Sequence, residues 1–356
     1  MARIAFYAAL KSPHHPVASG ERTIARNLMT ALEQPGSTVD LVSEFRPLDK
    51  RGDTAAQAGF EAEAAEIAEQ LIAQGGWDAW VSYHSYYKAP DLLGPVVSKA
   101  LGIPYVLIEA TRASKRLGGP WDGFERKAAA ACDAADVLFH FTSRDAVALR
   151  RDLRDGQVLV ALPPFLGHFD LPVATEASAP IILMAGMMRA GDKLASYEIA
   201  AQVLAHLTGD WQVEIAGDGP ERDRVEALMA PFGDRVRFLG ALDASVMAEA
   251  YGRARVFFWP GVNEAFGMVY LEAQAYGVPV VAQDRPGVNE VVAPGGLCPQ
   301  QSPEALAEAI SQVLNDPAQH AVRASTAQER VRTFHLMGAA QTTLWDALAP
   351  LLSEAT

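Results

Sequence analysis

Two glutamates, Glu264 and Glu272, lie eight residues apart in the segment WPGVNEAFGMVYLEAQAYGVPVV. The segment predicts a strand that ends at Trp259, a loop that carries Glu264, and a helix that begins near Gly267. The start of a helix presents free backbone N–H groups and a partial positive charge, which suits a bound diphosphate. The absence of a side chain at Gly267 lets a phosphate approach the backbone closely, beside Met268.

The two carboxylates are placed for different tasks. Glu272 falls in the second turn of the predicted helix, and side chains on a helix point back toward its start. There the carboxylate can accept hydrogen bonds from a ribose diol. Glu264, on the loop, can reach a sugar attached to the diphosphate. A glutamate pair at this spacing is common on ordinary helices, so the assignment depends on the surrounding sequence.

The whole chain has the size and composition of a two-domain globular protein. It has 356 residues, half of them hydrophobic, and a formal net charge of −13. Such a charge, without a long basic stripe, argues against nucleic-acid binding. Two cysteines far apart indicate neither a disulfide framework nor a metal cluster. The first ten residues are too short an apolar run for a signal peptide or a spanning helix, so we expect a cytoplasmic protein.

Short apolar runs alternate with amphipathic stretches, which is typical of β-α units around a parallel sheet. In the first half we expect strands at Ile4–Ala9, Val39–Val42, Ala79–Tyr83, Tyr105–Glu109, Val137–Phe141 and Val158–Ala161, and helices at Glu21–Leu32, Gly59–Gln74 and Asp122–Ala134. In the second half we expect strands at Ile181–Ala185, Val213–Ala216, Val236–Phe238, Val256–Trp259 and Val278–Ala282.

A segment rich in proline, alanine and serine, residues 163–180, predicts a linker between the two halves. We therefore expect an N-terminal domain over residues 1–172 and a C-terminal domain over 173–332. Residues 333–356 are expected to form a helix that crosses back onto the first domain. The predicted fold class is α/β, with two Rossmann-like open parallel-sheet domains that face a central cleft.

The sequence around the two glutamates resembles the large E-x7-E family of retaining GT-B glycosyltransferases, family 4 type. The segment IAGDGPERDRV resembles the glycine turn of that family, and RFLGAL resembles its next strand and loop. The resemblance is strong over residues 180–295 and mainly architectural before them. It implies that the domain over 1–172 binds the acceptor and that the domain over 173–332 binds the nucleotide sugar. It implies donor-binding roles for Gly217, Asp218, Gly219 and Gly240, in addition to Glu272, Gly267 and Met268, and a catalytic role for Glu264.

Members of the family bind the donor phosphates with an arginine and a lysine in the first loop of the C-terminal domain, in the pattern G-R-x5-K. Here the loop reads AGMMRAGDKLAS, which places Lys193 at the lysine position and Met187 at the arginine position. Arg189 lies two residues further on, and its long guanidinium fork can substitute for the missing arginine. The alternative is that Arg189 and Lys193 are simply exposed loop cations.

The resemblance also marks residues in the first half. Ser19 and Gly20 match the glycine loop of the family and are candidates for acceptor contact, whereas His14 and His15 lack further ligands for a metal. Family members carry a histidine after the strand at Tyr105–Ile108, where this chain has Glu109.

Two further positions near that strand follow from the same comparison. His84 matches another frequent family histidine, although it can equally be a capped strand end. We expect Glu109 to accept a hydrogen bond from a hydroxyl of the sugar or acceptor, or to pair with Arg112 or Lys115. Those two cations and Arg116 can meet an anionic acceptor or a membrane surface.

The resemblance implies transfer of a sugar from a nucleotide-diphosphate donor, with retention, to a glycan, lipid-linked or small acceptor. The chain contains no Asp-x-Asp triplet, so we expect no metal or other cofactor. A lipid-linked acceptor would bring the protein to the inner face of the membrane. Two alternatives are a nucleotide-sugar epimerase of the same fold and a non-catalytic subunit that binds nucleotide sugars.

Overall fold

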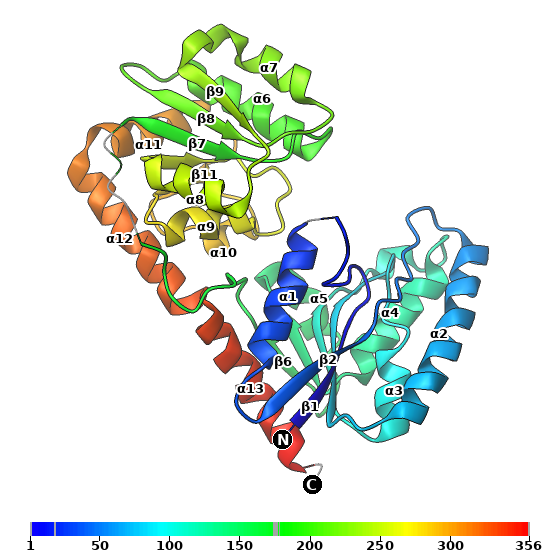
Figure 1. Ribbon diagram of the computed structural model, residues 1–356. Helices are drawn as coiled ribbons and strands as arrows, with labels where there is room; N and C mark the ends of the chain where they lie inside the picture. Colours follow the sequence, from blue (N-terminus) through cyan, green and yellow to red (C-terminus); the bar gives the residue numbers. More distant parts are fainter. Residues whose placement is uncertain (1, 18, 174–176, 178, 355–356) are drawn as a thin grey trace. The chain divides into compact units, whose positions relative to one another are not determined.

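The computed structural model describes residues 2–17, 19–173, 177 and 179–354. The chain divides into two compact units, which Figure 1 shows with their helices and strands. Unit 1 comprises Met1–Pro163 and Met337–Thr356, and unit 2 comprises Pro164–Leu336.

Unit 1 is a parallel sheet of six strands covered by helices. The strand order is β2-β1-β3-β4-β5-β6. The strands are β1 (Ala2–Ala8), β2 (Ser37–Ser43), β3 (Ala79–Ser85), β4 (Tyr105–Ala110), β5 (Val137–His140) and β6 (Val158–Ala161), and the helices are α1 (Gly20–Leu32), α2 (Thr54–Gln74), α3 (Gly94–Leu101), the 3-10 turn η1 (Ser114–Arg116), α4 (Asp122–Ala134), α5 (Ser143–Arg151) and α13 (Met337–Glu354). Chain order changes direction between β1 and β3, and functional loops gather at such a switch point in open α/β sheets.

Local sequence explains where the helices beside this edge begin. The hydroxyl of Ser19 accepts a hydrogen bond from the backbone N–H of Arg22 and caps α1. The carboxylate of Asp53 accepts hydrogen bonds from Ala55 and Ala56 and caps the alanine-rich α2. Both faces of the sheet are covered, so central strands such as β3 are buried almost throughout.

Unit 2 repeats this plan with the strand order β12-β11-β10-β7-β8-β9. The strands are β7 (Ile181–Ala185), β8 (Gln212–Ala216), β9 (Val236–Gly240), β10 (Val256–Phe258), β11 (Val280–Gln283) and β12 (Leu297–Cys298), and the helices are α6 (Asp192–Ala205), α7 (Arg222–Met229), the 3-10 helix η2 (Ala230–Arg235), α8 (Ala244–Arg253), α9 (Met268–Ala275), α10 (Val288–Val291), α11 (Pro303–Asn315) and α12 (Pro317–Phe334). The predicted two-domain α/β fold is confirmed.

The units divide at different residues from those predicted. The boundaries lie after Pro163 and after Leu336, not at 172 and 332. Phe165 and Leu166 of the predicted linker are buried, so this part packs within unit 2. The linker residues 174–176 and 178 lie outside the described residues.

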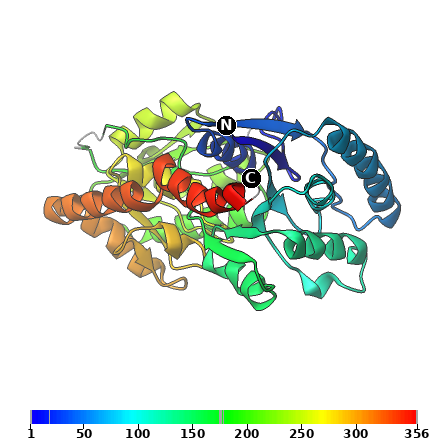
Figure 2. The same cartoon turned by 90° about the horizontal axis from the view of Figure 1, so that it is seen from below.

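The predicted C-terminal helix, residues 333–356, falls on two helices. α12 ends at Phe334 and α13 begins at Met337. Residues near Pro164 contact His335, which lies between the two helices. His335 Nδ1 lies 2.7 Å from the carbonyl oxygen of Pro164, and the N–H of Leu166 donates to the carbonyl of His335 (2.8 Å). α13 then packs on α1 within unit 1, where Gln341 Nε2 donates to the carbonyl of Glu33 (2.9 Å) (Figures 1 and 2).

Within the described residues, no helix combines the length and apolarity needed to cross a membrane.

Candidate active site

Three loops of unit 2 meet at the carboxyl ends of β7, β8 and β9. Gly186 donates a hydrogen bond to the carbonyl of Ala216, and Gly217 donates to that of Gly240. A Cβ on Gly217 would lie 1.9 Å from the carbonyl oxygen of Gly186, and one on Gly219 would lie 2.3 Å from that of Met188. The glycine turn is therefore needed for backbone packing, whatever it contributes to a ligand.

Lys193 and Glu264 come together at this edge, although they are far apart in the chain. Lys193 is the second residue of α6, and its Nζ forms an ion pair with Glu264 Oε1. The same Nζ lies 5.6 Å from the centre of a Trp259 ring. Trp259 Nε1 donates to Glu264 Oε1 (3.0 Å). A cation and a carboxylate from distant parts of the chain are thus held in contact.

The loop between β10 and α9 is fixed in a strained conformation. Asn263, next to Glu264, has φ 50°, a region that non-glycine residues seldom occupy. Its side-chain amide donates to Asp192 Oδ1 (3.0 Å), and the N–H of Val262 donates to Ser196 Oγ (3.1 Å). Both contacts tie the loop to the first turns of α6. Strain of this kind is concentrated at functional sites.

The helix start expected near Gly267 is present. Gly267 has φ 79° and lies at the N-cap of α9, with no side-chain capping hydrogen bond among the described residues. A Cβ at this position would lie 2.6 Å from the ring of Tyr270. The first backbone N–H groups of α9, at Met268 and Val269, therefore lack a side-chain cap and suit an anion.

Glu272 has its own hydrogen-bond partner. Tyr251 Oη on α8 donates to Glu272 Oε2 (2.9 Å), and the Tyr251 ring stacks on Tyr276 with 5.3 Å between centroids. Burial raises the pKa of Glu272, and the hydrogen bond from Tyr251 opposes this shift. The hydroxyl orients the carboxylate through one of its two oxygens.

The arginine position of the resemblance is occupied by an exposed methionine. Met187 has a relative exposure of 45%, and Arg189 is also exposed. The backbone N–H of Arg189 donates to the carbonyl of Met187 (3.1 Å), which shows a tight turn between the two residues. Arg189 thus projects from the same loop as the missing arginine.

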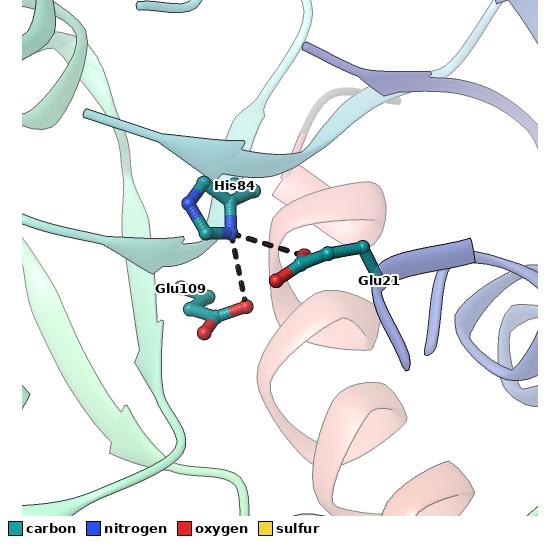
Figure 3. Close-up of side chains that lie close together, drawn as sticks. All are labelled: Glu21, His84 and Glu109. Atoms are coloured by element: carbon teal, nitrogen blue, oxygen red, sulfur yellow. Dashed lines mark hydrogen bonds and ion pairs between the residues drawn. The ribbon is translucent and has the colours of Figure 1, made fainter. Parts of the chain in front are cut away.

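In unit 1, Glu21, His84 and Glu109 form a second constellation (Figure 3). His84 Nδ1 lies 3.3 Å from Glu109 Oε2 and 3.4 Å from Glu21 Oε2. Tyr83 Oη donates to Glu21 Oε2 (2.9 Å). His84 and Glu109 have φ 64° and 56°, so each strand departs from extended geometry where it presents its side chain. We call these three side chains the Glu-His-Glu cluster.

The carboxylates keep His84 protonated at neutral pH. Burial disfavours the imidazolium, but the charges and hydrogen bonds of Glu109 and Glu21 outweigh this effect and raise the pKa of His84 to about 10. For Glu21, the hydrogen bond and charge of His84 outweigh burial and lower the pKa. Burial raises the pKa of Glu109 despite its contact with His84.

This arrangement predicts a pH-dependent stability. The pKa of His84 is raised from 6.5 to about 10. The stabilisation of the folded state by protonated His84 is therefore complete below pH 6.5 and is lost as the pH rises through 10. Between pH 7 and 10, we expect the free energy of unfolding to fall more for the wild-type protein than for His84→Gln. The difference should be about 1.4 kcal/mol for each unit by which the pKa of His84 is raised in the folded protein. Urea unfolding at several pH values measures this difference. His206→Gln, at an exposed histidine, is the control, and parallel profiles for His84→Gln and wild type would contradict the prediction.

The Glu-His-Glu cluster is also the set of described residues that can hold a metal ion, since its ligand atoms lie within 4.8 Å of one another. A protonated imidazole cannot coordinate, so metal binding would require His84 to lose its proton. The expected independence from metals stays a prediction.

Several candidates of unit 1 have structural roles. Ser19 caps α1, whereas a Cβ on Gly20 would meet no atom within 4 Å. His14 lies 3.7 Å from Glu44, and His15 Nδ1 accepts from Val17 (3.2 Å).

The expected pairing of Glu109 with a loop cation is wrong for Arg112. Arg112 Nη2 lies 2.6 Å from Asp133 Oδ1, and the carboxylate of Glu109 faces His84 instead. The site residues predicted from sequence did not include Trp259, Tyr251 and Glu21. Only Glu21 had a signal, because it directly follows the glycine loop.

Comparisons with known proteins place the second unit in a family of enzymes. Residues 179–330 match the family model described as Glycosyl transferases group 1. An alpha-D-kanosaminyltransferase of Streptomyces kanamyceticus is 33% identical over 144 residues, which are 39% of this chain and 37% of that protein. A GDP-mannose-dependent alpha-(1-6)-phosphatidylinositol dimannoside mannosyltransferase of Mycobacterium tuberculosis is 30% identical over 142 residues, 39% and 37% of the two chains. The chain thus spans only 37% of the length of these relatives.

Solved structures extend the likeness to both units. A sucrose-phosphate synthase from Thermosynechococcus elongatus has a TM-score of 0.75 at 22% identity and covers 99% of this chain and 100% of its own. Anabaena HepE in complex with UDP has a TM-score of 0.71 at 16% identity, over 98% and 100% of the chains. The fold is therefore the two-domain α/β fold of GT-B glycosyltransferases.

Proposed function

We propose that the protein is a retaining glycosyltransferase that moves a sugar from a nucleotide-diphosphate donor to a hydroxylated acceptor without a metal. The observation that carries the proposal is the contact of Lys193 and Glu264, beside the open start of α9, within the region that matches group 1. The ion pair supplies both a phosphate ligand and a sugar ligand at one strand edge.

In this proposal each group of unit 2 has one task. Lys193, Arg189 and the N–H groups at Met268 and Val269 bind the diphosphate. Glu272 binds the ribose diol, and Glu264 binds the transferred sugar. Because the donor phosphates compete with Glu264 for Lys193, donor binding releases the carboxylate toward the sugar.

Retention is proposed to proceed on the front face of the sugar. The bond from the anomeric carbon to the phosphate oxygen breaks, and the acceptor oxygen bonds to that carbon on the same face. The departing phosphate oxygen takes the acceptor proton, so no dedicated base is needed. Cations and helix N–H groups that already point at the phosphate stabilise the developing charge.

Incubation with UDP- and GDP-sugars in the absence of an acceptor tests the function. A transferase should release free sugar slowly, because water replaces the acceptor. Appearance of an epimer would identify an epimerase, and binding without any product would identify a non-catalytic subunit. A thermal-shift panel of the same nucleotide sugars names the base and sugar, since a bound ligand raises the melting temperature.

Activity should survive EDTA. The phosphate charge is met by Lys193, Arg189 and the start of α9, none of which requires a metal. Transfer or donor hydrolysis is measured in EDTA and after addition of Mn²⁺ or Mg²⁺. Complete loss in EDTA with recovery on metal addition would contradict metal independence, and Glu109→Gln would then show whether the Glu-His-Glu cluster holds the ion.

A further inference from the structure

Aromatic rings and cations form a connected group in unit 1, beside the Glu-His-Glu cluster. Tyr87 follows β3 and Trp121 precedes α4, and their rings meet edge to face with 5.7 Å between centroids. The Arg116 guanidinium lies 4.6 Å from the Tyr87 ring centre and 5.5 Å from that of Trp121. Lys88 Nζ lies 5.5 Å from the Tyr87 ring centre. We call Tyr87, Lys88, Arg116 and Trp121 the aromatic–cation platform.

The cations of this platform have no acidic partner in the described part of the chain. Neither Lys88 nor Arg116 forms an ion pair there, and the same is true of the neighbouring exposed Lys115. Arg112, only a few residues earlier, is paired with Asp133. Lys88 and Arg116 share the Tyr87 ring, and Lys115 precedes Arg116 in the chain; three such cations without an ion pair among the described residues favour an anionic ligand.

The hydrogen bonds of Arg116 leave capacity for such a ligand. Its Nη2 donates to Tyr87 Oη (3.2 Å), and its Nε is buried without a partner among the described residues. A guanidinium has five N–H donors, which match the oxygens of a phosphate in a fork. The rings that hold Arg116 restrict its motion, so less entropy is lost on binding.

A second loop braces the platform. Trp121 Nε1 donates to the carbonyl of Asp49 (3.2 Å), and the N–H of Asp49 donates to the carbonyl of Lys88 (2.9 Å). The loop also carries two exposed cations, Lys50 and Arg51. The carboxylates of Asp49 and Asp53 lie in the same loop, so the cations on which the proposal depends are those of the loops after β3 and β4.

Aromatic contacts connect the platform to the Glu-His-Glu cluster. The rings of His84 and Tyr86 lie 5.0 Å apart, and those of Tyr86 and Tyr87 lie 5.5 Å apart. At the cluster, carboxylates accept hydrogen bonds from hydroxyls and repel anions. At the platform, cations attract anions. The Glu-His-Glu cluster therefore favours the hydroxylated end of a ligand, and the aromatic–cation platform favours its anionic end.

We propose that the aromatic–cation platform binds the phosphate of an acceptor whose hydroxylated body lies toward Glu109. The ligand class is a phosphate ester of a sugar or polyol, either free or as the head group of a lipid. That this ligand is the acceptor rests on the proposed function. The binding of a phosphate ester can be tested without any transfer reaction.

Calorimetry with the whole protein tests both sources of this chemistry. One arm uses glucose 6-phosphate and inositol 1-phosphate, each compared with the unphosphorylated compound. The other arm measures sedimentation with phosphatidylcholine vesicles that contain or lack phosphatidylinositol. We expect binding in one arm that requires phosphate and weakens as salt rises.

The double variant Lys88→Met/Lys115→Met should weaken that binding at least ten-fold. Lys99→Met, at an exposed lysine near the end of α3, should not change it. Absence of binding in both arms, or equal weakening by Lys99→Met, would overturn the proposal. Loss of nucleotide-diphosphate affinity in the double variant would also overturn it, because the cations would then serve the donor. If phosphate esters bind but no nucleotide sugar does, the platform stands and the proposed transferase function fails.

Discussion

Glu272→Ala should bind a bare nucleotide diphosphate at least about ten-fold more weakly than the wild-type protein. The lost contact is a hydrogen bond to a charged group, worth about 1.5–3 kcal/mol. Glu264→Ala should keep the wild-type affinity or exceed it, because it frees Lys193 for phosphate, while turnover falls at least about ten-fold. Calorimetry with UDP and GDP and measurement of transfer or hydrolysis separate these effects.

Conservative variants sharpen the comparison. Tyr251→Phe removes the hydrogen bond to Glu272 but keeps the ring that stacks on Tyr276, so it should lower nucleotide affinity less than Glu272→Ala. Glu264→Gln still offers an oxygen to Trp259 Nε1 but has no charge for Lys193. Equal losses of nucleotide affinity in Glu264→Ala and Glu272→Ala would contradict the division of tasks.

Gly287→Ala should destabilise unit 2 by several kcal/mol. Gly287 has φ 86°, and a Cβ there would lie 1.7 Å from the carbonyl oxygen of Ala265. The left-handed conformation costs a non-glycine residue about 1–2 kcal/mol. Displacement of the backbone next to Glu264 adds about 1–3 kcal/mol. The free energy of unfolding in urea measures the sum.

Gly209→Ala separates the two costs. Gly209 lies in the same unit with φ 80°, but a Cβ there would meet no atom within 4 Å. Only the conformational cost should remain. If Gly209→Ala and Gly287→Ala are equally stable, the close approach of the two loops is not maintained in solution. Nucleotide affinity of Gly287→Ala should also fall, since the displaced loop leads into Gly267 and the start of α9, which are proposed to bind the diphosphate.

Much of the architecture could be predicted from local pattern alone. β6, β7 and α4 have the predicted bounds. For β7 the apolar run coincides with a fully buried strand. The C-terminal helix could not be predicted as two helices. Its break at His335 depends on a contact with Pro164, which lies 171 residues earlier in the chain.

For unit 2, the sequence predicted the spacing of Glu264 and Glu272 and the start of a helix near Gly267. The ion pair of Glu264 with Lys193 was not, because it requires β10 to lie beside β7, an order that no local signal encodes. Nor was the orienting hydroxyl of Tyr251, which comes from another helix.

For unit 1, the sequence by itself determined that His84 and Glu109 lie at the ends of strands, as their apolar runs require. The tertiary structure alone decided that they meet. The parallel register pairs Tyr83 with Ile108 and Ser85 with Ala110, which places His84 beside Glu109, and α1 adds Glu21. Strand order and register are set by packing over the whole sheet, so they decide which distant side chains share a site and how their protons are held.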